Sequence, residues 1–455
     1  MNLRILPPEE MIDAIVSVPI SKSICNRLLV INALTPNAQP VDPVADCDDS
    51  RVLAQVLQAL QNGATEVNTG NAGTATRFAS AFIAANSSLG DKEITLECSE
   101  RMRQRPIGPL VEALRSLGAK IEYLEEDGFP PLRITPQQLV RGEIEIDATI
   151  SSQFISALMM VAPTMTNGLT IRLVGEAASR PYINMTAQLI CRAGIDAEFE
   201  RYTITIPHGT YQPADQTIEA DWSAASYWYE LAAIAAGFIT IRDLQLPSLQ
   251  GDSRCAEFFE MLGVTTSEPD DDDFDEPVNG LAISPSPEQF SRFEVDLSEN
   301  PDLAQTFAVT CAMLGIPFHL RGLSTLRIKE TDRLEAMRSQ LDKFGLIVEI
   351  RNNSELVWNG ERHPIFTIPV IETFGDHRMA MAFAPTAIFV PGIIILNAEV
   401  VEKSYPDYWQ QLQNVGFQLD EVVLSDIAAD TEIDPAALNP NQDNEPARNS
   451  AFPIG

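Results

Sequence analysis

Apolar residues recur with helical spacing in two kinds of segment that alternate along the chain. Segments of the first kind begin with small or polar residues and continue as an apolar helix; they start at Ser21, Gly73, Ser151, Ser223, Asp302 and Asp376. Segments of the second kind are more polar and end near a glycine; they start at Asp49, Arg105, Ser179, Asp252, Lys329 and Tyr405. A glycine just past a helix is a typical C-cap. The pattern therefore predicts six copies of a helix pair.

Short runs of alternating apolar and polar residues lie between these helical segments and predict strands. They cover residues 93–98, 142–147, 169–174, 238–244, 318–323 and 392–400. The chain is thus expected to be an α/β protein that repeats a unit of strands and two helices.

Two acidic stretches fall outside this pattern. The run from Glu268 to Glu276 repels itself and predicts a solvated loop. Residues 425–455 are acidic, contain proline and are weakly apolar, which predicts a disordered tail.

Composition narrows the class of protein. The chain has 455 residues, of which 45% are hydrophobic and 21% charged, so it is a globular protein large enough for two lobes. Its 31 basic and 64 acidic residues give a net charge of −33, which argues against binding to nucleic acid or a membrane surface. No apolar run reaches the roughly 18 residues of a membrane span. The chain start lacks a signal-peptide pattern, so a cytoplasmic location is expected.

Cysteine and histidine patterns give no sign of a metal site. The six cysteines are scattered without a CxxC pair and are expected to be reduced thiols. The four histidines form no zinc-binding spacing, and neither a P-loop nor a dinucleotide-binding motif is present.

Basic residues stand out at the starts of the repeated helices. They are Lys22, Arg27, Arg77, Arg105, Lys329, Arg333, Arg378 and Lys403. Helix N-termini already attract anions, and added arginine and lysine side chains would make a pocket for a multiply anionic small ligand. The alternative is a set of surface ion pairs worth about 0–1 kcal/mol each. Their recurrence at equivalent repeat positions favours the pocket.

Polar residues beside these cations leave two interpretations open. Asp302 could accept a proton from a substrate hydroxyl or could cap a helix. The SSQ sequence at Ser151 could cap a helix or donate hydrogen bonds to substrate oxygens.

Eight motifs together resemble the 5-enolpyruvylshikimate-3-phosphate synthase family (3-phosphoshikimate 1-carboxyvinyltransferase) of the enolpyruvyl transferases. They are SKSICNR, NAGTATR, ERMRQRPIG, SSQF, SRPYINMT, KETDR, DHRMAM and KSYPDYW, in the family's order. The resemblance extends from about Val18 to Phe417. It implies two lobes, each with three β-α-β-α-β-β units. Lobe I would comprise residues 1–18 and 219–424, and lobe II residues 19–218.

The resemblance also implies a reaction. The enolpyruvyl group of phosphoenolpyruvate would move to the 5-hydroxyl of shikimate 3-phosphate, with release of phosphate, by addition and elimination. This is a step of the shikimate pathway toward chorismate and the aromatic amino acids. No metal or organic cofactor is implied, and a monomer is the simplest expectation. Closure of the lobes would expel water from the substrates.

The matching positions give an implied set of site residues. Shikimate 3-phosphate would bind Lys22, Ser23, Arg27, Ser151, Ser152, Gln153, Ser179, Tyr182, Asp302, Thr325 and Lys329. Phosphoenolpyruvate would bind Lys22, Gly73, Arg105, Gln153, Arg333, Arg378 and Lys403. The catalytic residues would be Lys22, Asp302, Glu330 and Lys403. In this set Asp302 accepts the hydroxyl proton, and Glu330 and Lys403 deliver and return a proton, in an order that the sequence leaves open.

Three positions depart from the family pattern. Ile20 stands where glycine is usual before SKS, and Thr325 where asparagine is common. Phe78 replaces a frequent proline after NAGTATR, which could reshape the pocket floor and the sensitivity to glyphosate. Because Gly73 is retained, we expect glyphosate to compete with phosphoenolpyruvate still.

Two other functions are consistent with parts of the pattern. A UDP-N-acetylglucosamine enolpyruvyl transferase would share the fold, but that family has a reactive cysteine on a loop before the arginine matched by Arg105. Here Cys98 lies inside a strand-like run. A non-catalytic relative that binds anionic metabolites would be expected to lose charged residues such as Lys22 or Asp302, and both are present.

Overall fold

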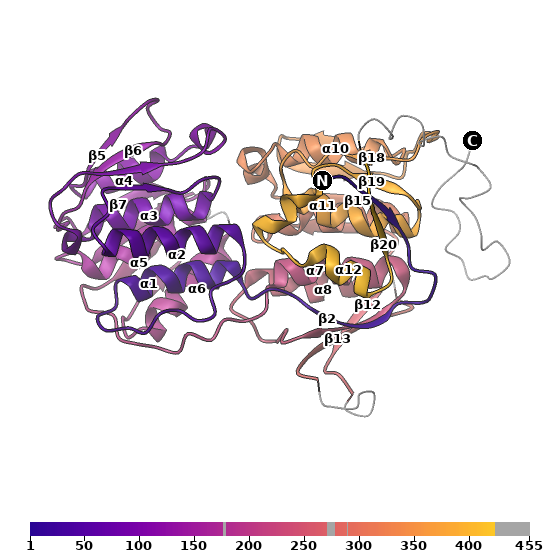
Figure 1. Ribbon diagram of the computed structural model, residues 1–455, viewed down its shortest axis with the longest axis horizontal. Coiled ribbons are helices and arrows are strands. Elements are labelled where there is room, and N and C mark those ends of the chain that lie inside the picture. The colour runs from indigo at the N-terminus through magenta and orange to yellow at the C-terminus, as the bar shows by residue number, and fades with distance from the viewer. Residues whose placement is uncertain (176–178, 271–277, 289, 424–455) are drawn as a thin grey trace. The chain divides into compact units, whose positions relative to one another are not determined.

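The computed structural model describes residues 1–175, 179–270, 278–288 and 290–423. The chain divides into two compact units (Figure 1). Unit 1 contains Met1–Pro19 and the chain from Ala220 onward, and unit 2 contains Ile20–Glu219. The lobe boundaries expected from the sequence lie one residue earlier. Residues 271–276 of the acidic run and the whole expected tail lie outside the described residues.

Unit 2 contains two four-stranded sheets of the same topology. The first has the order β3-β4-β6-β5, and the second the order β7-β8-β10-β9. The strands are β3 (Glu66–Asn68), β4 (Ile94–Glu97), β5 (Lys120–Tyr123), β6 (Leu132–Thr135), β7 (Glu143–Asp147), β8 (Leu169–Val174), β9 (Glu198–Glu200) and β10 (Thr203–Ile206). In each sheet the first two strands are parallel and the remaining pairings are antiparallel. A parallel pair needs a crossover connection, which a helix provides in each case.

Unit 1 contains three sheets with this topology. Their orders are β12-β13-β11-β2, β14-β15-β17-β16 and β18-β19-β1-β20. The strands are β1 (Leu3–Leu6), β2 (Asp13–Ser17), β11 (Phe238–Arg242), β12 (Val264–Ser267), β13 (Gly280–Pro285), β14 (Phe293–Asp296), β15 (Phe318–Arg321), β16 (Glu349–Arg351), β17 (Glu355–Trp358), β18 (Val370–Ile371), β19 (Ile393–Ile395) and β20 (Gln418–Glu421).

The N-terminal strands complete two sheets whose other strands come from after residue 220. Leu3 of β1 pairs with Ile395 of β19 on one side and with Glu421 of β20 on the other. Strand β2 runs parallel to β11, with Asp13 opposite Phe238. Figure 1 shows the indigo β1 among the orange and yellow elements of unit 1 and the indigo β2 beside its pink elements. This pairing makes unit 1 discontinuous in sequence.

The six expected helix pairs are all confirmed. The first-kind helices are α1 (Lys22–Ala33), α3 (Gly73–Ala85), α5 (Ser152–Val161), α7 (Trp222–Ala235), α9 (Ala304–Leu314) and α11 (His377–Phe383). The second-kind helices are α2 (Asp48–Gln61), α4 (Gly108–Ser116), α6 (Arg180–Arg192), α8 (Cys255–Glu260), α10 (Arg333–Asp342) and α12 (Tyr408–Asn414). A glycine with φ between +80° and +107° follows every second-kind helix: Gly63, Gly118, Gly194, Gly263, Gly345 and Gly416.

The strands differ from the expectation in two places. The apolar run 392–400 is a strand only over Ile393–Ile395, and Ala398–Lys403 form a 3₁₀ helix, η9. In the described ranges there are five four-stranded sheets for the six helix pairs, because α1 and α2 have no such sheet of their own.

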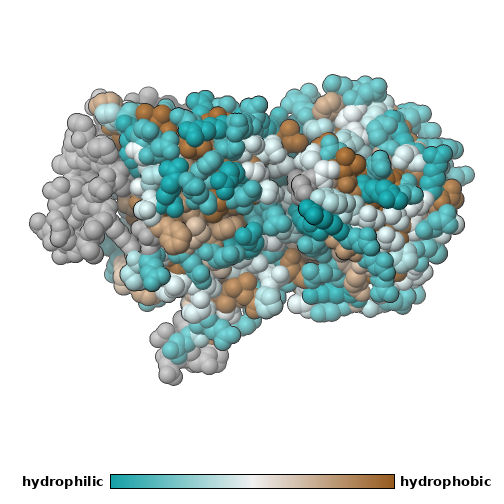
Figure 2. All heavy atoms as spheres, turned by 180° about the vertical axis from the view of Figure 1, so that it is seen from behind, coloured by the Kyte–Doolittle hydropathy of each residue, from teal (hydrophilic) through white to brown (hydrophobic). Residues whose placement is uncertain are grey.

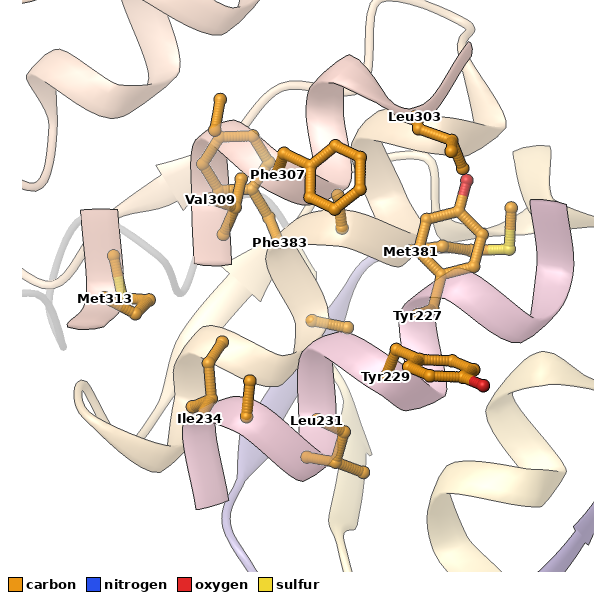
Figure 3. Close-up of a cluster of buried hydrophobic side chains, with 14 of the residues drawn as sticks. Tyr227, Tyr229, Leu231, Ile234, Leu303, Phe307, Val309, Met313, Met381 and Phe383 are labelled. Carbon is orange, nitrogen blue, oxygen red and sulfur yellow. The ribbon is translucent and has the colours of Figure 1, made fainter. Parts of the chain in front are cut away.

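The first-kind helices form the core of each unit, which explains why their sequences are apolar on nearly every face. In α3, twelve of the thirteen residues are buried, all but Thr74. In unit 1, helices α7, α9 and α11 contact one another. Figure 3 shows Tyr227 of α7 next to Met381 of α11, and Phe307 of α9 near Phe383.

The face shown in Figure 2 carries mostly hydrophilic residues. On the face in Figure 2, apolar residues are scattered among polar ones. Within residues 1–423, apart from the three short gaps, no helix is both long and apolar enough to cross a membrane.

Candidate active site

Asp302 is the centre of a charge cluster in unit 1. It lies in the 3₁₀ turn Pro301–Leu303 that leads into α9, and its side chain is 19% exposed. Its Oδ1 atom is 2.8 Å from Nη1 of Arg333 and 3.4 Å from Nζ of Lys329. Its Oδ2 atom accepts a hydrogen bond of 3.2 Å from Nη2 of Arg378. Asp302 therefore pairs with three cations from α10, α11 and the turn before α10.

Arg333 holds three carboxylates around one buried guanidinium. It is the first residue of α10 and 2% exposed. Its Nε and Nη2 atoms donate to the two oxygens of Asp376, at 2.6 and 3.2 Å. Nη2 also donates to Glu330 at 2.9 Å, and Nη1 donates to Asp302. Asp376 in turn caps α11 by accepting from the backbone N–H of Arg378.

Lys403 joins the cluster through Glu330, and Arg378 has a second partner besides Asp302. Lys403, at the end of η9, donates to Oε1 of Glu330 at 2.7 Å. Arg378 donates from Nη1 to the hydroxyl of Tyr227 at 3.4 Å. Among the described residues, the ion pairs of this cluster join four cations to three carboxylates.

The charges of this cluster shift each other's protonation. Burial raises the pKa of Asp302, but Arg378, Lys329 and Arg333 outweigh burial and hold that pKa well below its usual range. Burial lowers the pKa of Lys329, an effect that Asp302 opposes and Arg333 adds to. Asp302 is therefore ionised at neutral pH.

The start of α1 in unit 2 brings a lysine next to an aspartate. Ser21 caps the helix by accepting a 3.4 Å hydrogen bond from the backbone N–H of Ile24. The next residue, Lys22, has its Nζ atom 3.6 Å from Oδ2 of Asp49, which lies in the first turn of α2. The lysine side chain is 20% exposed, so it can reach a ligand.

The start of α3 is crowded by two arginines. A Cβ added at Gly73 would lie 2.7 Å from Nη1 of both Arg105 and Arg77. Arg77 donates to Oε1 of Gln153 at 3.2 Å, and Gln153 donates to Thr74 at 3.3 Å. A larger residue at position 73 would displace both guanidinium groups, which is a physical reason for glycine there.

The starts of α5 and α6 provide hydroxyl groups. Ser151 caps α5 by accepting from the backbone N–H of Gln153 at 3.3 Å, and Ser152 is buried. Ser179 precedes α6 with φ +56°, an unusual conformation for a residue other than glycine. Such backbone conformations are enriched at functional sites.

The structure brings the expected site residues together in two groups, one in each unit. The unit 1 group contains Asp302, Lys329, Glu330, Arg333, Arg378 and Lys403. In unit 2 the expected residues lie at the starts of α1, α3, α5 and α6, where Arg77 links Gly73 and Gln153, and Arg27 contacts Tyr182. Thr325 lies in the turn η7 (Ser324–Ile328), where its Oγ1 atom is buried and has no hydrogen-bond partner among the described residues.

Three residues in contact with these groups were not identified from the sequence. They are Asp49, Asp376 and Tyr227, which contact Lys22, Arg333 and Arg378. The two aspartates stand at the starts of repeated helices, as the cations do, and this position could have indicated them. Tyr227 lies inside an apolar helix and gave no signal. Across the described ranges no cluster of three or more metal-ligating side chains is present.

The repeated architecture of this chain is similar to that of a solved structure. The EPSP synthase of Acinetobacter baumannii superposes with a TM-score of 0.73 over 92% of this chain and 100% of that one, at 19% identity. A likeness at this identity shows the fold. This chain therefore has the EPSP synthase fold.

Sequence comparisons identify the family. The sequence-family model of EPSP synthase (3-phosphoshikimate 1-carboxyvinyltransferase) matches residues 7–412 of this chain. A 3-phosphoshikimate 1-carboxyvinyltransferase of Bacteroides fragilis is 44% identical over 91% of this chain and 98% of its own length. One from Escherichia coli is 34% identical over 91% and 99%. The chain belongs to the EPSP synthase family.

Proposed function

We propose that the protein transfers the enolpyruvyl group of phosphoenolpyruvate to the 5-hydroxyl of shikimate 3-phosphate. The bond between the hydroxyl oxygen and C2 of phosphoenolpyruvate forms, the bond from C2 to the phosphate oxygen breaks, and inorganic phosphate leaves. The observation that carries this proposal is the carboxylate of Asp302 held among Arg333, Lys329 and Arg378. It combines a proton acceptor with cations that bind anionic substrates.

The phosphoenolpyruvate site is assigned to cations of both groups. Arg333, Arg378 and Lys403 of unit 1, with Lys22, Gly73, Arg105 and Gln153 of unit 2, would bind its phosphate and carboxylate. Phosphate and carboxylate oxygens suit the paired N–H groups of arginine. Gly73 keeps Arg105 in its place, because any side chain there would meet its guanidinium.

The shikimate 3-phosphate site is assigned to hydroxyl groups and lysines. Ser23, Ser151, Ser152, Gln153, Ser179, Tyr182 and Thr325, with Lys22, Arg27, Asp302 and Lys329, would bind its phosphate, carboxylate and hydroxyls. The helix starts at α1 and α5 add free backbone N–H groups, which stabilise anions.

Asp302 is assigned as the acceptor of the 5-hydroxyl proton. With three cations around it, its low pKa makes it a weak base. An anionic substrate that takes over Arg378 or Lys329 removes part of this stabilisation and raises the pKa of Asp302. Substrate binding would thus make Asp302 more basic when the proton has to move.

Glu330 and Lys403 are assigned to proton delivery to the methylene carbon and its return. Their hydrogen bond of 2.7 Å allows the proton to pass between the two groups. We further propose that glyphosate competes with phosphoenolpyruvate, that the enzyme acts as a monomer without metal or organic cofactor, and that it works in the cytoplasm.

The test is phosphate release from the purified protein with phosphoenolpyruvate and either of two acceptors. We expect release with shikimate 3-phosphate and none with UDP-N-acetylglucosamine. Release only with the nucleotide sugar would reject the acceptor assignment, and no release with either would reject the transferase.

The role of Asp302 is tested by Asp302→Asn. We expect kcat to fall by at least about 100-fold, because general-base groups contribute roughly 10²–10⁴. Asp302→Glu, which keeps the carboxylate, is expected to retain more activity, and the exposed Asp342→Asn serves as the control. Equal activity of Asp302→Asn and the control would remove Asp302 from the mechanism.

A further inference from the structure

Arg27 ties together three helices of unit 2. It lies on α1, is 2% exposed and makes four hydrogen bonds, all to neutral acceptors. Nε donates to Thr186 at 2.7 Å and Nη1 to the carbonyl of Ser23 at 2.8 Å. Nη2 donates to Ser156 at 3.0 Å and to the carbonyl of Tyr182 at 3.4 Å. A guanidinium has five N–H donors, so among the described residues one N–H on Nη1 is left for a ligand.

The charge of Arg27 is not balanced by an acid. No carboxylate of the described residues forms an ion pair with it, and burial lowers its pKa to about 10. Two aromatic rings lie near the guanidinium instead: its Cζ atom is 5.6 Å from the ring centre of Phe78 and 5.8 Å from that of Tyr182. Both distances are within the range of a cation–π interaction, which strengthens when water is excluded.

Phe78 is buried inside unit 2. It is 0% exposed on α3, one residue after Arg77, which contacts Gln153. Its ring reaches Arg27 on α1.

We propose that Phe78 is a positioning residue that fixes Arg27, so that the remaining N–H on Nη1 binds an anionic group of the acceptor substrate. This inference rests on the proposed function. Tyr182 contributes the second ring, but it belongs to the acceptor site itself, whereas Phe78 acts only through Arg27. Phe78 would therefore set the affinity for the acceptor and leave the affinity for phosphoenolpyruvate unchanged.

The test is Phe78→Met, which keeps an apolar side chain but removes the aromatic ring. We expect the KM for shikimate 3-phosphate to rise about fivefold to thirtyfold, from the loss of a desolvated cation–π contact. The KM for phosphoenolpyruvate and kcat are expected to stay within about twofold. Phe82→Met is the matched control, because Phe82 lies one turn further along α3 and is also fully buried.

A second measurement isolates the ring electrostatics. Fluorinated phenylalanines at position 78 keep the ring shape but weaken its attraction for a cation. Calorimetric Kd values for shikimate 3-phosphate are expected to rise with each added fluorine. Equal KM and Kd values in the Phe78 variants and the control, with a wild-type enzyme that releases phosphate, would overturn the inference and leave the proposed function intact. A wild-type enzyme without release would overturn both.

Discussion

Arg333 and Glu230 are both ionisable side chains buried in unit 1, but Arg333 keeps its charge whereas Glu230 is neutral. Arg333 is satisfied by three carboxylates, which stabilise its charged form and raise its pKa. Glu230 of α7 is 0% exposed, and neither of its carboxyl oxygens has a hydrogen-bond partner among the described residues. Burial raises the pKa of Glu230 well above its usual range. The side chain is therefore a neutral acid inside the helical core of unit 1.

Glu230 makes stability depend on pH. A carboxyl with a raised pKa in the folded state contributes most stability below its unfolded pKa, and this contribution is lost as pH rises toward the folded value. In the wild type, Glu230 is expected to lower the unfolding free energy by up to ~1.4 kcal/mol for each pH unit between about pH 5 and 8. We expect Glu230→Gln to remove this part of the pH dependence. Denaturant unfolding at several pH values measures the unfolding free energy of both proteins.

The control for this experiment is Glu260→Gln, at an exposed position on α8. Its pH profile is expected to follow the wild type. If Glu230→Gln followed the wild type as well, Glu230 would not be the neutral buried acid that its surroundings indicate.

Individual charged residues could be predicted from the sequence more easily than their partners. Lys22 and Arg378 were identified because they lie at the starts of repeated helices, whereas Lys403 lies at the end of η9. The partners Asp49 and Asp376 were not, since many acids were available and only the packing of the helices selects among them. Tyr227 could not be predicted, because its hydroxyl meets Arg378 only through the contact of α7 with α11.

The helices end as their local sequences dictate. Gly118 follows α4 with φ +107°, and its N–H donates to the carbonyl of Arg115. The next N–H, from Ala119, bonds back to Leu114, which is the hydrogen bond of a Schellman cap. A glycine can adopt this conformation without strain, so the end of each helix is encoded within a few residues.

The substitution Gly118→Ala tests the role of this glycine in ending helix α4. Nothing lies within 4 Å of an added Cβ, so only the backbone conformation would be strained. We expect a loss of about 1 kcal/mol in unfolding free energy, with kcat unchanged. Ser116→Ala, in the last turn of the same helix, controls for local side-chain changes. A loss as large in the control, or none in Gly118→Ala, would contradict the cap.

Helix pairs could be predicted because periodicity and caps are local. Sheet membership could not, because β1 and β2 pair with strands more than 200 residues away in the chain. The same limit explains why a sixth sheet was expected beside α1 and α2 but is absent from the described residues. The helix pattern repeats six times, whereas the described strands form five sheets.

At the scale of the whole molecule, the net charge of −33 dominates the long-range electrostatics. Like charges at this density destabilise a compact state, and salt screens them with a Debye length of about 10 Å at 0.1 M. The cations of the two site groups gather positive charge in a chain that is otherwise acidic. Positive potential is therefore concentrated where anionic substrates are proposed to bind.

This charge predicts that salt stabilises the protein. At pH 7 we expect the Tm to rise when NaCl is increased from about 0.05 to 1 M, because repulsion between acidic residues is screened. Near the isoelectric point of about 4.4 the same increase is expected to have little effect. A Tm that falls with salt at pH 7, or rises equally at both pH values, would contradict this explanation.

The most direct test of the proposed reaction is to follow phosphoenolpyruvate labelled with ¹³C at C2 by NMR, with shikimate 3-phosphate and the wild-type enzyme. We expect a new enol-ether carbon signal, coupled through the 5-oxygen to the ring of shikimate 3-phosphate, which appears in step with one equivalent of inorganic phosphate. Phosphate release without that signal, or the signal only when UDP-N-acetylglucosamine replaces shikimate 3-phosphate, would contradict the proposed reaction.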